Sequence, residues 1–456
     1  MSIKALVLSL VFSAVSLSGC MIKVQPDTQK FSPLDNTIRS TPAFRSNQSG
    51  QISKNIQEPS GVLTLRESLS LALMKNPSLA AFSWEMKARD AARIQAALLP
   101  NPELNFEIEN FAGSSPLQAV DQAETTISLG QLIEMAGKRS KRERVASLNH
   151  DLAGWDYETR RVELFTDVTK SFISVLGDQQ KVSLSEDLLK LARQVAETVS
   201  KRVNAGKVSP VEEIKANVAL ASSKIDLDRA KKALRASRKF LAAMWGNPHP
   251  KFQSVKGVLD VPGALPEFDQ LIDRLSHNPE LARWAIEVAQ RKAVISLEKA
   301  NAIPDITIGG GFRQFNESDA TAFVAGISID LPVFNRNQGS IGEARAQHSK
   351  AIAEQDATVL HIKAALTEAY RILSTTHVAA LGLKNELLPG AERTFEAVNE
   401  GYRLGKFDLL DVLDAQRTLA QARAQYLQAQ IDHQQSLADV EQLIGERLDR
   451  KKFITK

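Results

Sequence analysis

Two stretches of the chain carry apolar and small residues at a strict alternating 4-3 spacing. The first runs from 216 to 244, and the pattern recurs 199 residues later, from 415 to 443. This spacing is typical of a helix that packs along one seam against other helices. His433 lies in the second seam, and we interpret it as a packed or snorkelling histidine and not as a ligand. One column of the seam is small in both copies, which predicts close helix packing: Ala216, Ser223, Ala230 and Ser237, then Ala415, Ala422, Ala429 and Ser436.

The seams belong to a longer repeat. Asn76-Pro77 recurs as Asn278-Pro279 and Gly206 recurs as Gly405, within a series of matches at offsets of 199 to 202. Matches in the same order at nearly one offset predict a structural unit that is repeated twice along the chain. Pro389-Gly390 interrupts the second long helical segment, which predicts a bend or a small side subdomain there. Each unit is expected to contain a first helix (64–98 and 266–301), two strands, a long helical segment (139–203 and 340–403), a glycine break and a further helix (210–245 and 408–444).

Four short segments alternate apolar and polar residues with a period of two. Leu104, Phe106 and Ile108 alternate with Asn and Glu, and similar alternation occurs at 126–129, 306–312 and 323–329. The pattern suits a barrel wall between lipid and water, or an ordinary antiparallel sheet packed on the helices. Membrane barrels need at least ~8 strands, so four strands would leave two unpaired edges in lipid. We therefore expect copies of the chain to share a barrel, and a helical wall favours three copies over two.

The N-terminus has the features of a bacterial lipoprotein precursor. Lys4 precedes an uncharged stretch at 5–18, which is shorter than a membrane-spanning helix and is typical of a signal peptide. The stretch ends in Leu17-Ser18-Gly19-Cys20, which resembles a lipobox and implies cleavage before Cys20 and acylation of that residue. Met21 after the cysteine favours the outer membrane. An ordinary secreted protein with a free cysteine is the alternative.

These features divide the chain into five parts. Residues 1–19 are the expected signal peptide, and 20–60, with Pro among Ser, Asn, Gln and Thr, are the expected lipid-anchored tether. The two repeats are expected at 61–260 and 261–448, and a basic tail at 449–456.

Composition narrows the function. The chain has 57 Lys and Arg against 53 Asp and Glu, and the net charge of +4 is small for 456 residues, so nucleic acid is not an expected partner. A single cysteine excludes a disulfide scaffold, and the seven histidines show no metal-ligand spacing. No nucleophile and base stand in a recognisable pattern, so we expect no enzyme, no cofactor and no metal site within one chain.

The motifs together resemble TolC-like outer-membrane efflux channels over roughly residues 60–445. The resemblance rests on the lipobox, the Asn-Pro pairs, the repeated layout, and the runs DLPVFNRNQG at 330–339 and GKFDLLDVLDA at 405–415. The first run is most similar to the heavy-metal (cobalt-zinc-cadmium) efflux branch.

The resemblance implies a mainly α fold with a small β part, assembled as a homotrimer. Long antiparallel coiled-coil helices would form an α-barrel tunnel in the periplasm, joined to a 12-stranded transmembrane β-barrel with four strands from each chain. The implied partners are outer-membrane lipid, a periplasmic adaptor (membrane fusion) protein and a proton-driven inner-membrane pump of the RND type. The implied activity is passive export of the pump's substrate, with metal cations favoured and drugs or other organic solutes as the alternative.

The candidate site residues follow the two glycine breaks. Glu212 and Asp411 each lie six residues after a glycine, and Asp414 lies one helical turn beyond Asp411. The resemblance places Asp411 and Asp414 at the periplasmic entrance, where threefold symmetry would make each a ring of carboxylates that attracts cations. Acids in a first helical turn also cap the helix, and we favour this role for Asp408.

The resemblance also implies a gate between the hairpins. Tyr402 and Glu212 match positions engaged in one closing link, with Asp408 as a further candidate contact. A second link would use a basic residue two positions after Gly405, where this chain has Phe407. Lys406 and Arg403 are the nearby basic residues.

A different class of function remains open from the residues alone. A lipid-anchored periplasmic coiled-coil scaffold without a pore would explain the seams. It would not explain the paired amphipathic strands.

Overall fold

The computed structural model describes residues 58–448, apart from 116 and 118. The expected signal peptide, Cys20, nearly all of the expected tether and the basic tail lie outside these residues.

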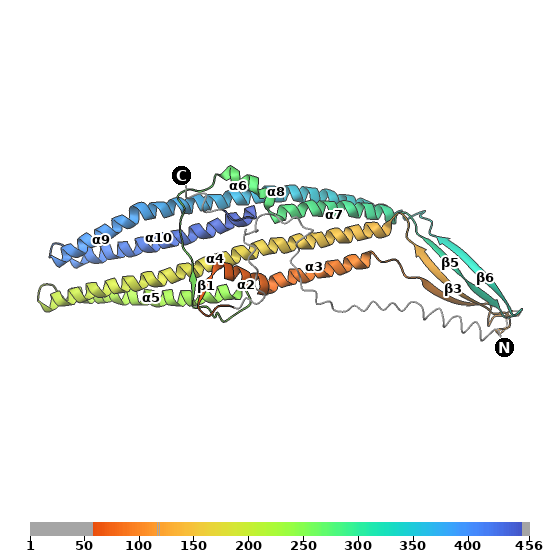
Figure 1. Cartoon of the computed structure of the whole chain (residues 1–456), viewed down its shortest axis with the longest axis horizontal. Helices are drawn as coiled ribbons and strands as arrows, with labels where there is room; N and C mark the ends of the chain where they lie inside the picture. The colour runs from red at the N-terminus through yellow and green to blue at the C-terminus, as the bar shows by residue number, and fades with distance from the viewer. Residues whose placement is uncertain (1–57, 116, 118, 449–456) are drawn as a thin grey trace. The chain divides into compact units, whose positions relative to one another are not determined.

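The described chain is built from long helices that end in one small sheet (Figure 1). The sheet lies at one end of the helices, and the two turns α4–α5 and α9–α10 lie at the other end. The first half contains β1 (Val62–Thr64), α2 (Leu65–Lys75), α3 (Pro77–Ala96), β2 (Glu103–Glu109), β3 (Glu124–Ile133), α4 (Lys138–Asn204) and α5 (Pro210–Ala243). The second half contains β4 (Ser254–Lys256), α6 (Phe268–Arg274), the 3-10 turn η2 (Leu275–His277), α7 (Pro279–Asn301), β5 (Ile306–Phe315), β6 (Ala320–Ile329), α8 (Gln338–Gly382), the π-helical turn η3 (Leu383–Leu387), α9 (Leu388–Arg403) and α10 (Leu409–Ile444).

The four expected strands form one antiparallel sheet in the order β2-β3-β5-β6. The central pair β3 and β5 joins the two halves of the chain, with Ile133 opposite Ile306. Leu104, Phe106 and Phe323 are exposed, the last at 84%. Within the described residues β2 and β6 each pair on one side only, so the sheet has two open edges.

A second, two-stranded sheet was not expected from the sequence. β1 pairs in parallel with β4, and Leu63 and Val255 are buried there against α4 side chains such as Phe172. Strands of three residues carry too little alternation to be recognised by their period.

The two apolar seams are confirmed as the packed faces of α5 and α10. Every α5 seam position between Ala216 and Met244 is buried or half-buried, and in α10 the seam from Ala415 to Leu443 is equally covered. Helices α4 and α10 pack closely at Gly177, where a Cβ would collide with the side chain of Ile431. The small residues of the two seams lie on these packed faces, where small side chains permit close helix packing.

The expectation of one unbroken first helix at 64–98 is wrong. Asn76 adopts an extended conformation that ends α2, and its side-chain oxygen accepts a bond from the Leu79 amide (2.9 Å) to start α3. Pro77 favours the break because proline fits the first turn of a helix and not its interior. The segment 266–301 is likewise divided, and Asn278 starts α7 by accepting from the Glu280 amide (2.8 Å).

Each of these asparagines also ties its helix to the end of a hairpin. The Asn76 side-chain amide donates to the Met244 carbonyl (2.8 Å), and that of Asn278 donates to the Leu443 carbonyl (2.8 Å). The two bonds join related positions in the two halves of the chain.

The long segment 340–403 is helical throughout and contains one π-helical turn. Helix α8 passes through η3 into α9, and Pro389 lies in the first turn of α9. Proline lacks the amide that would donate one turn back, and a π-helical turn accommodates the missing bond. Within the described residues this region bends as a helix and forms no side subdomain.

His433 is packed, as expected. It is 0% exposed, and its ring lies 5.4 Å from the ring of His377 on α8, centroid to centroid. Burial lowers the pKa of His377, so the neutral ring is favoured in this helix interface.

Replacing Asn278 should measure the tie between α7 and α10. Asn278→Ala removes both the cap and the bond to Leu443, and we expect a loss of about 1–3 kcal/mol in unfolding free energy. Asn278→Asp keeps the cap acceptor and should cost less. Thermal unfolding followed by circular dichroism checks this, with the exposed Asn301→Ala on the same helix as control. Equal melting temperatures for the Asn278 and Asn301 alanine variants would contradict the assignment.

Candidate gate at the helical hairpin turns

The two hairpin turns have the same backbone design. Gly206 and Gly405 both adopt left-handed conformations, with φ of 70° and 77°. The amide after each glycine donates back across the turn, from Lys207 to the Arg202 carbonyl (2.9 Å) and from Lys406 to the Gly401 carbonyl (2.8 Å). This bonding is the usual way in which a glycine ends a helix.

Tyr402 connects the two hairpins. Its side chain is 2% exposed, and its hydroxyl lies 3.3 Å from the Glu212 carboxylate of α5, to which it donates. Arg202 of α4 donates to the Tyr402 carbonyl (2.6 Å), and its guanidinium lies 4.2 Å from the centre of the Tyr402 ring. The predicted contact between Tyr402 and Glu212 is therefore present within one chain, although its role in gating stays a prediction.

Arg202 was not singled out from the sequence. It lies four residues before Gly206, among other basic residues at the end of a long helix, where cations commonly interact with the helix dipole. Only the packing of α4 beside α9 and α10 distinguishes it from its neighbours.

Burial raises the pKa of the Tyr402 hydroxyl, and the Glu212 charge raises it further, whereas Arg202 acts in the opposite direction. The phenol is therefore protonated at neutral pH and available as a donor. Glu212 and Arg202 contact the tyrosine from two different helices, and this arrangement fixes the position of α9 relative to the first hairpin.

Phe407 has a packing role in the turn. A Cβ on Gly401 would collide with the Phe407 ring, so the ring lies directly over the Gly401 backbone. Arg403 pairs with Glu400 of its own helix (3.1 Å), and Lys406 is exposed. In this chain an apolar contact therefore closes the α9–α10 turn where the resemblance implies a basic link.

The three aspartates occupy the start of α10. Asp408 is the N-cap, as favoured above, and it exchanges bonds with Asp411, each amide donating to the other carboxylate (3.2 Å). Asp414 pairs with Arg417 (2.6 Å). Asp411 and Asp414 are exposed, while Leu409 and Val412 of the same turns are buried. One chain thus presents both carboxylates away from its own packed seam.

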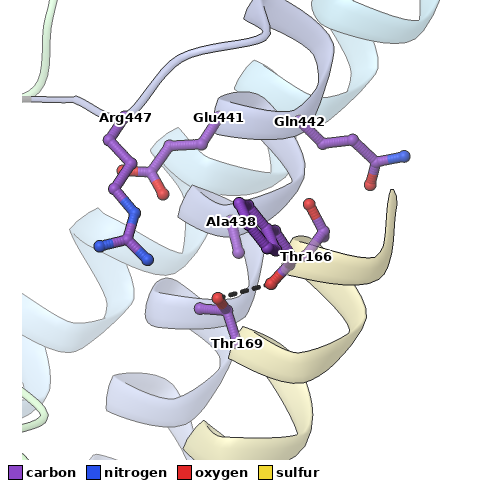
Figure 2. A pocket seen from close by; sticks show the side chains of 7 residues that line it. Thr166, Thr169, Ala438, Glu441, Gln442 and Arg447 are labelled. Atoms are coloured by element: carbon purple, nitrogen blue, oxygen red, sulfur yellow. Dashed lines mark hydrogen bonds between the residues drawn. The ribbon is translucent and has the colours of Figure 1, made fainter. Parts of the chain in front are cut away.

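A small recess between α4 and α10 lies away from these turns (Figure 2). Thr169 donates there to the Phe165 carbonyl (2.7 Å), and the buried Glu441 accepts from the Leu448 amide (3.0 Å). Its polar groups thus bond within the helices and to the following chain, which is the role of packing residues. In the described part of the chain, no three His, Cys, Asp or Glu side chains come together as a group that could hold a metal ion.

The sequence that forms the two hairpins and the sheet matches a known family. The model of the outer membrane efflux protein family matches residues 68–247 and 272–446. The chain therefore belongs to this family of outer-membrane efflux channels. Among residues 58–448, no helix combines the length and apolar character needed to cross a membrane.

Relatives and solved structures agree with this assignment. The chain is 36% identical over 389 residues to the cobalt-zinc-cadmium resistance protein CzcC of Cupriavidus metallidurans, covering 85% of this chain and 91% of that one. It is 22% identical over 415 residues to the pyoverdine export outer membrane protein OpmQ of Pseudomonas aeruginosa, covering 84% and 85%. The fold is similar to that of CusC (TM-score 0.69, 17% identity, 84% and 92% covered) and of the outer-membrane channel OprN (TM-score 0.71, 18% identity, 89% and 94% covered).

Weakening the contact between Arg202 and Tyr402 should loosen the attachment between the two hairpins. Arg202→Gln removes the charge and the stacked guanidinium, and we expect channel conductance in planar bilayers to rise several-fold. Tyr402→Phe keeps the ring and the carbonyl, so its effect should be smaller. Arg193→Gln, an exposed position on the same helix, is the matched control. A conductance for Arg202→Gln equal to that of the control would show that the contact does not restrain the channel.

Proposed function

We propose that this chain forms the outer-membrane duct of a tripartite efflux system and exports metal cations. In this proposal three copies assemble, and the duct receives its substrate through a periplasmic adaptor protein from an inner-membrane pump of the RND type. The observation that carries the cargo assignment is the 36% identity to a cobalt-zinc-cadmium resistance protein along 91% of that relative.

The sheet supports assembly from several copies. Four strands with two open edges leave backbone donors and acceptors unpaired, and such edges are not tolerated in lipid. Pairing β6 of one copy with β2 of the next removes every edge once the ring closes. The exposed apolar side chains of the strands then face lipid.

The entrance is proposed to lie at the hairpin turns. Asp411 and Asp414 are exposed at the start of α10, so a threefold assembly can place their carboxylates around one axis. A ring of carboxylates at a constriction concentrates cations and excludes anions. The Tyr402, Glu212 and Arg202 contacts, with Asp408 at the cap, are proposed to hold this entrance closed.

The lipid anchor is proposed at Cys20. The lipobox-like sequence supports cleavage before this residue, and acylation at more than one position makes a stable anchor. The anchor would add to attachment by the strands and is not needed to hold the channel in the membrane.

Export of an organic solute is the second candidate. It is favoured by the identity to OpmQ, which extends over most of both chains at the lower level of 22%. Deleting the gene and measuring tolerance to cobalt, zinc and cadmium beside tolerance to organic compounds separates the two candidates. Loss of metal tolerance alone supports the first, and loss of tolerance to organic compounds alone refutes it.

Neutralising the entrance aspartates should reduce cation selectivity. We expect Asp411→Asn with Asp414→Asn to lower the cation-to-anion permeability ratio several-fold, because asparagine keeps the size and removes the charge. Reversal potentials under a salt gradient give this ratio. Glu396→Gln on the exposed face of α9 removes a charge elsewhere and should leave the ratio unchanged. A double variant with unaltered reversal potential would refute the ring.

Removing the anchor should not release the protein. A Cys20→Ser variant of a duct held by strands stays in the membrane fraction after a high-salt wash and requires detergent for extraction. A coiled-coil scaffold held only by lipid would instead appear in the soluble fraction. Fractionation and immunoblotting beside the unchanged chain decide between the two.

A further inference from the structure

The linker after β3 is bonded to the residue that precedes β5. Asp305 Oδ1 accepts from the Met135 amide (2.8 Å) and lies 2.8 Å from Lys138 Nζ. Lys138 is buried, and Gly137 before it adopts a left-handed conformation that starts α4. This junction locks the two halves of the chain together where the sheet gives way to the helices.

The second half of the chain repeats the donor side of this junction. Asn337 also adopts a left-handed conformation and starts α8, as Gly137 starts α4, and the two residues are 200 positions apart. The same offset places Asn335 at the position of Met135 and Gln338 at the position of Lys138.

The first half repeats the acceptor side. Glu103 lies opposite Gly130 in the β2–β3 pair. The β5–β6 register ends at Ile306 opposite Ile329, and continuing it by one residue relates Asp305 to Asp330 in the same way. Glu103 therefore occupies the position of Asp305, at the offset of 202 that also relates Asn76 to Asn278. The copied donors follow β6 and the copied acceptor begins β2, at opposite edges of the sheet.

The linker after β6 is bonded to α7 through Asn337 and Glu298, and it lacks the arginine pair of its counterpart. In the first half, Glu134 pairs with Arg142, which also donates to the Ala96 carbonyl (2.9 Å). Phe334 and Gly342 occupy the corresponding positions in the second half. Phe334 is 91% exposed, and Leu331 and Val333 beside it are also exposed.

We propose that a second copy of this chain covers this linker, with Glu103 of that copy taking the part of Asp305. The Glu103 carboxylate accepts from the backbone amide of Asn335 and from the side-chain amide of Gln338. Strand β6 pairs with β2 of the second copy so that Ile329 lies opposite Ile108 of that copy. Gln338 already donates to the Phe334 carbonyl (3.3 Å), and its amide has a second hydrogen for this contact. The inference rests on the shared sheet of the proposed function and names the residues that close it.

A second copy fits this surface better than lipid does. The linker presents polar groups at Asn335, Arg336 and Gln338 beside its apolar residues, and Glu103 offers an acceptor at the matching register. A lipid surface would cover Phe334 but would offer no acceptor at the register of Asn335 and Gln338.

A restored ion pair tests the contact directly. Gln338→Lys recreates across two copies the pair that Lys138 makes with Asp305, so we expect the oligomer to dissociate at a higher temperature in SDS. The gain should disappear in a Glu103→Gln background, and Gln347→Lys on the same helix should give none. A gain that survives Glu103→Gln, or that the control also shows, overturns the assignment.

Cross-linking provides a test that does not depend on stability. Glu103→Cys with Asn335→Cys, in a Cys20→Ser background, should form disulfides between copies on oxidation and give a ladder of dimer and trimer. Asn335→Cys with Glu317→Cys, at the far end of the β5–β6 hairpin, should give none.

The outcomes separate this inference from the proposed function. A conducting oligomer without the cross-link, and with no coupling between Gln338→Lys and Glu103→Gln, overturns the inference and leaves the duct intact. A purified chain that is monomeric and gives no ion current overturns both. A fluorophore on Asn335→Cys that shifts to the blue in phospholipid vesicles, without cross-linking in the Cys pair, assigns the linker to lipid and overturns the inference.

Discussion

Close approach of helices along columns of small residues is the constraint on which the rest of the structure depends. Most of the stability of a helix in a protein comes from tertiary packing, and α4 has buried residues from Lys138 to Val199. Gly177 brings α4 close to Ile431 of α10, and the small positions of α5 and α10 lie on the packed faces of those helices. The same packing holds α4 beside α10, and Tyr402 meets Arg202 and Glu212 only because these helices keep a fixed register down to the turns.

The two hairpin turns share a backbone and differ in chemistry. The segment after Gly206 contributes Glu212 to the contact between hairpins. The turn at Gly405 is closed by an aromatic ring over Gly401. The first hairpin therefore supplies electrostatic restraint and the second supplies packing. The Asp408 and Asp411 capping box serves the start of α10 as a helix terminus, whatever further role the exposed carboxylates have.

The sequence predicted the features that follow from the periodicity of its residues. It did not predict those that depend on tertiary contacts. The seams, the four strands and the glycine turns each repeat over many residues or at a fixed offset, and all appear as expected. The sequence predicted one helix across Asn76-Pro77, which the structure divides into α2 and α3. The contact of Tyr402 with Glu212 was reached through family resemblance, whereas Arg202 has no local signal. Three-residue strands such as β1 and β4 and the turn at η3 are set by neighbours that are distant in sequence.

In the proposed assembly from several copies, the open edges of the sheet have a consequence for the chain before it assembles. A single copy in transit to the membrane exposes β2 and β6, and bare strand edges recruit any other extended segment they meet. Correct and incorrect partners then compete for these edges. The outcome depends on the local concentration of the chain and on chaperones that shield the strands. Overproduction without matching secretion capacity should therefore yield aggregates before it yields channels.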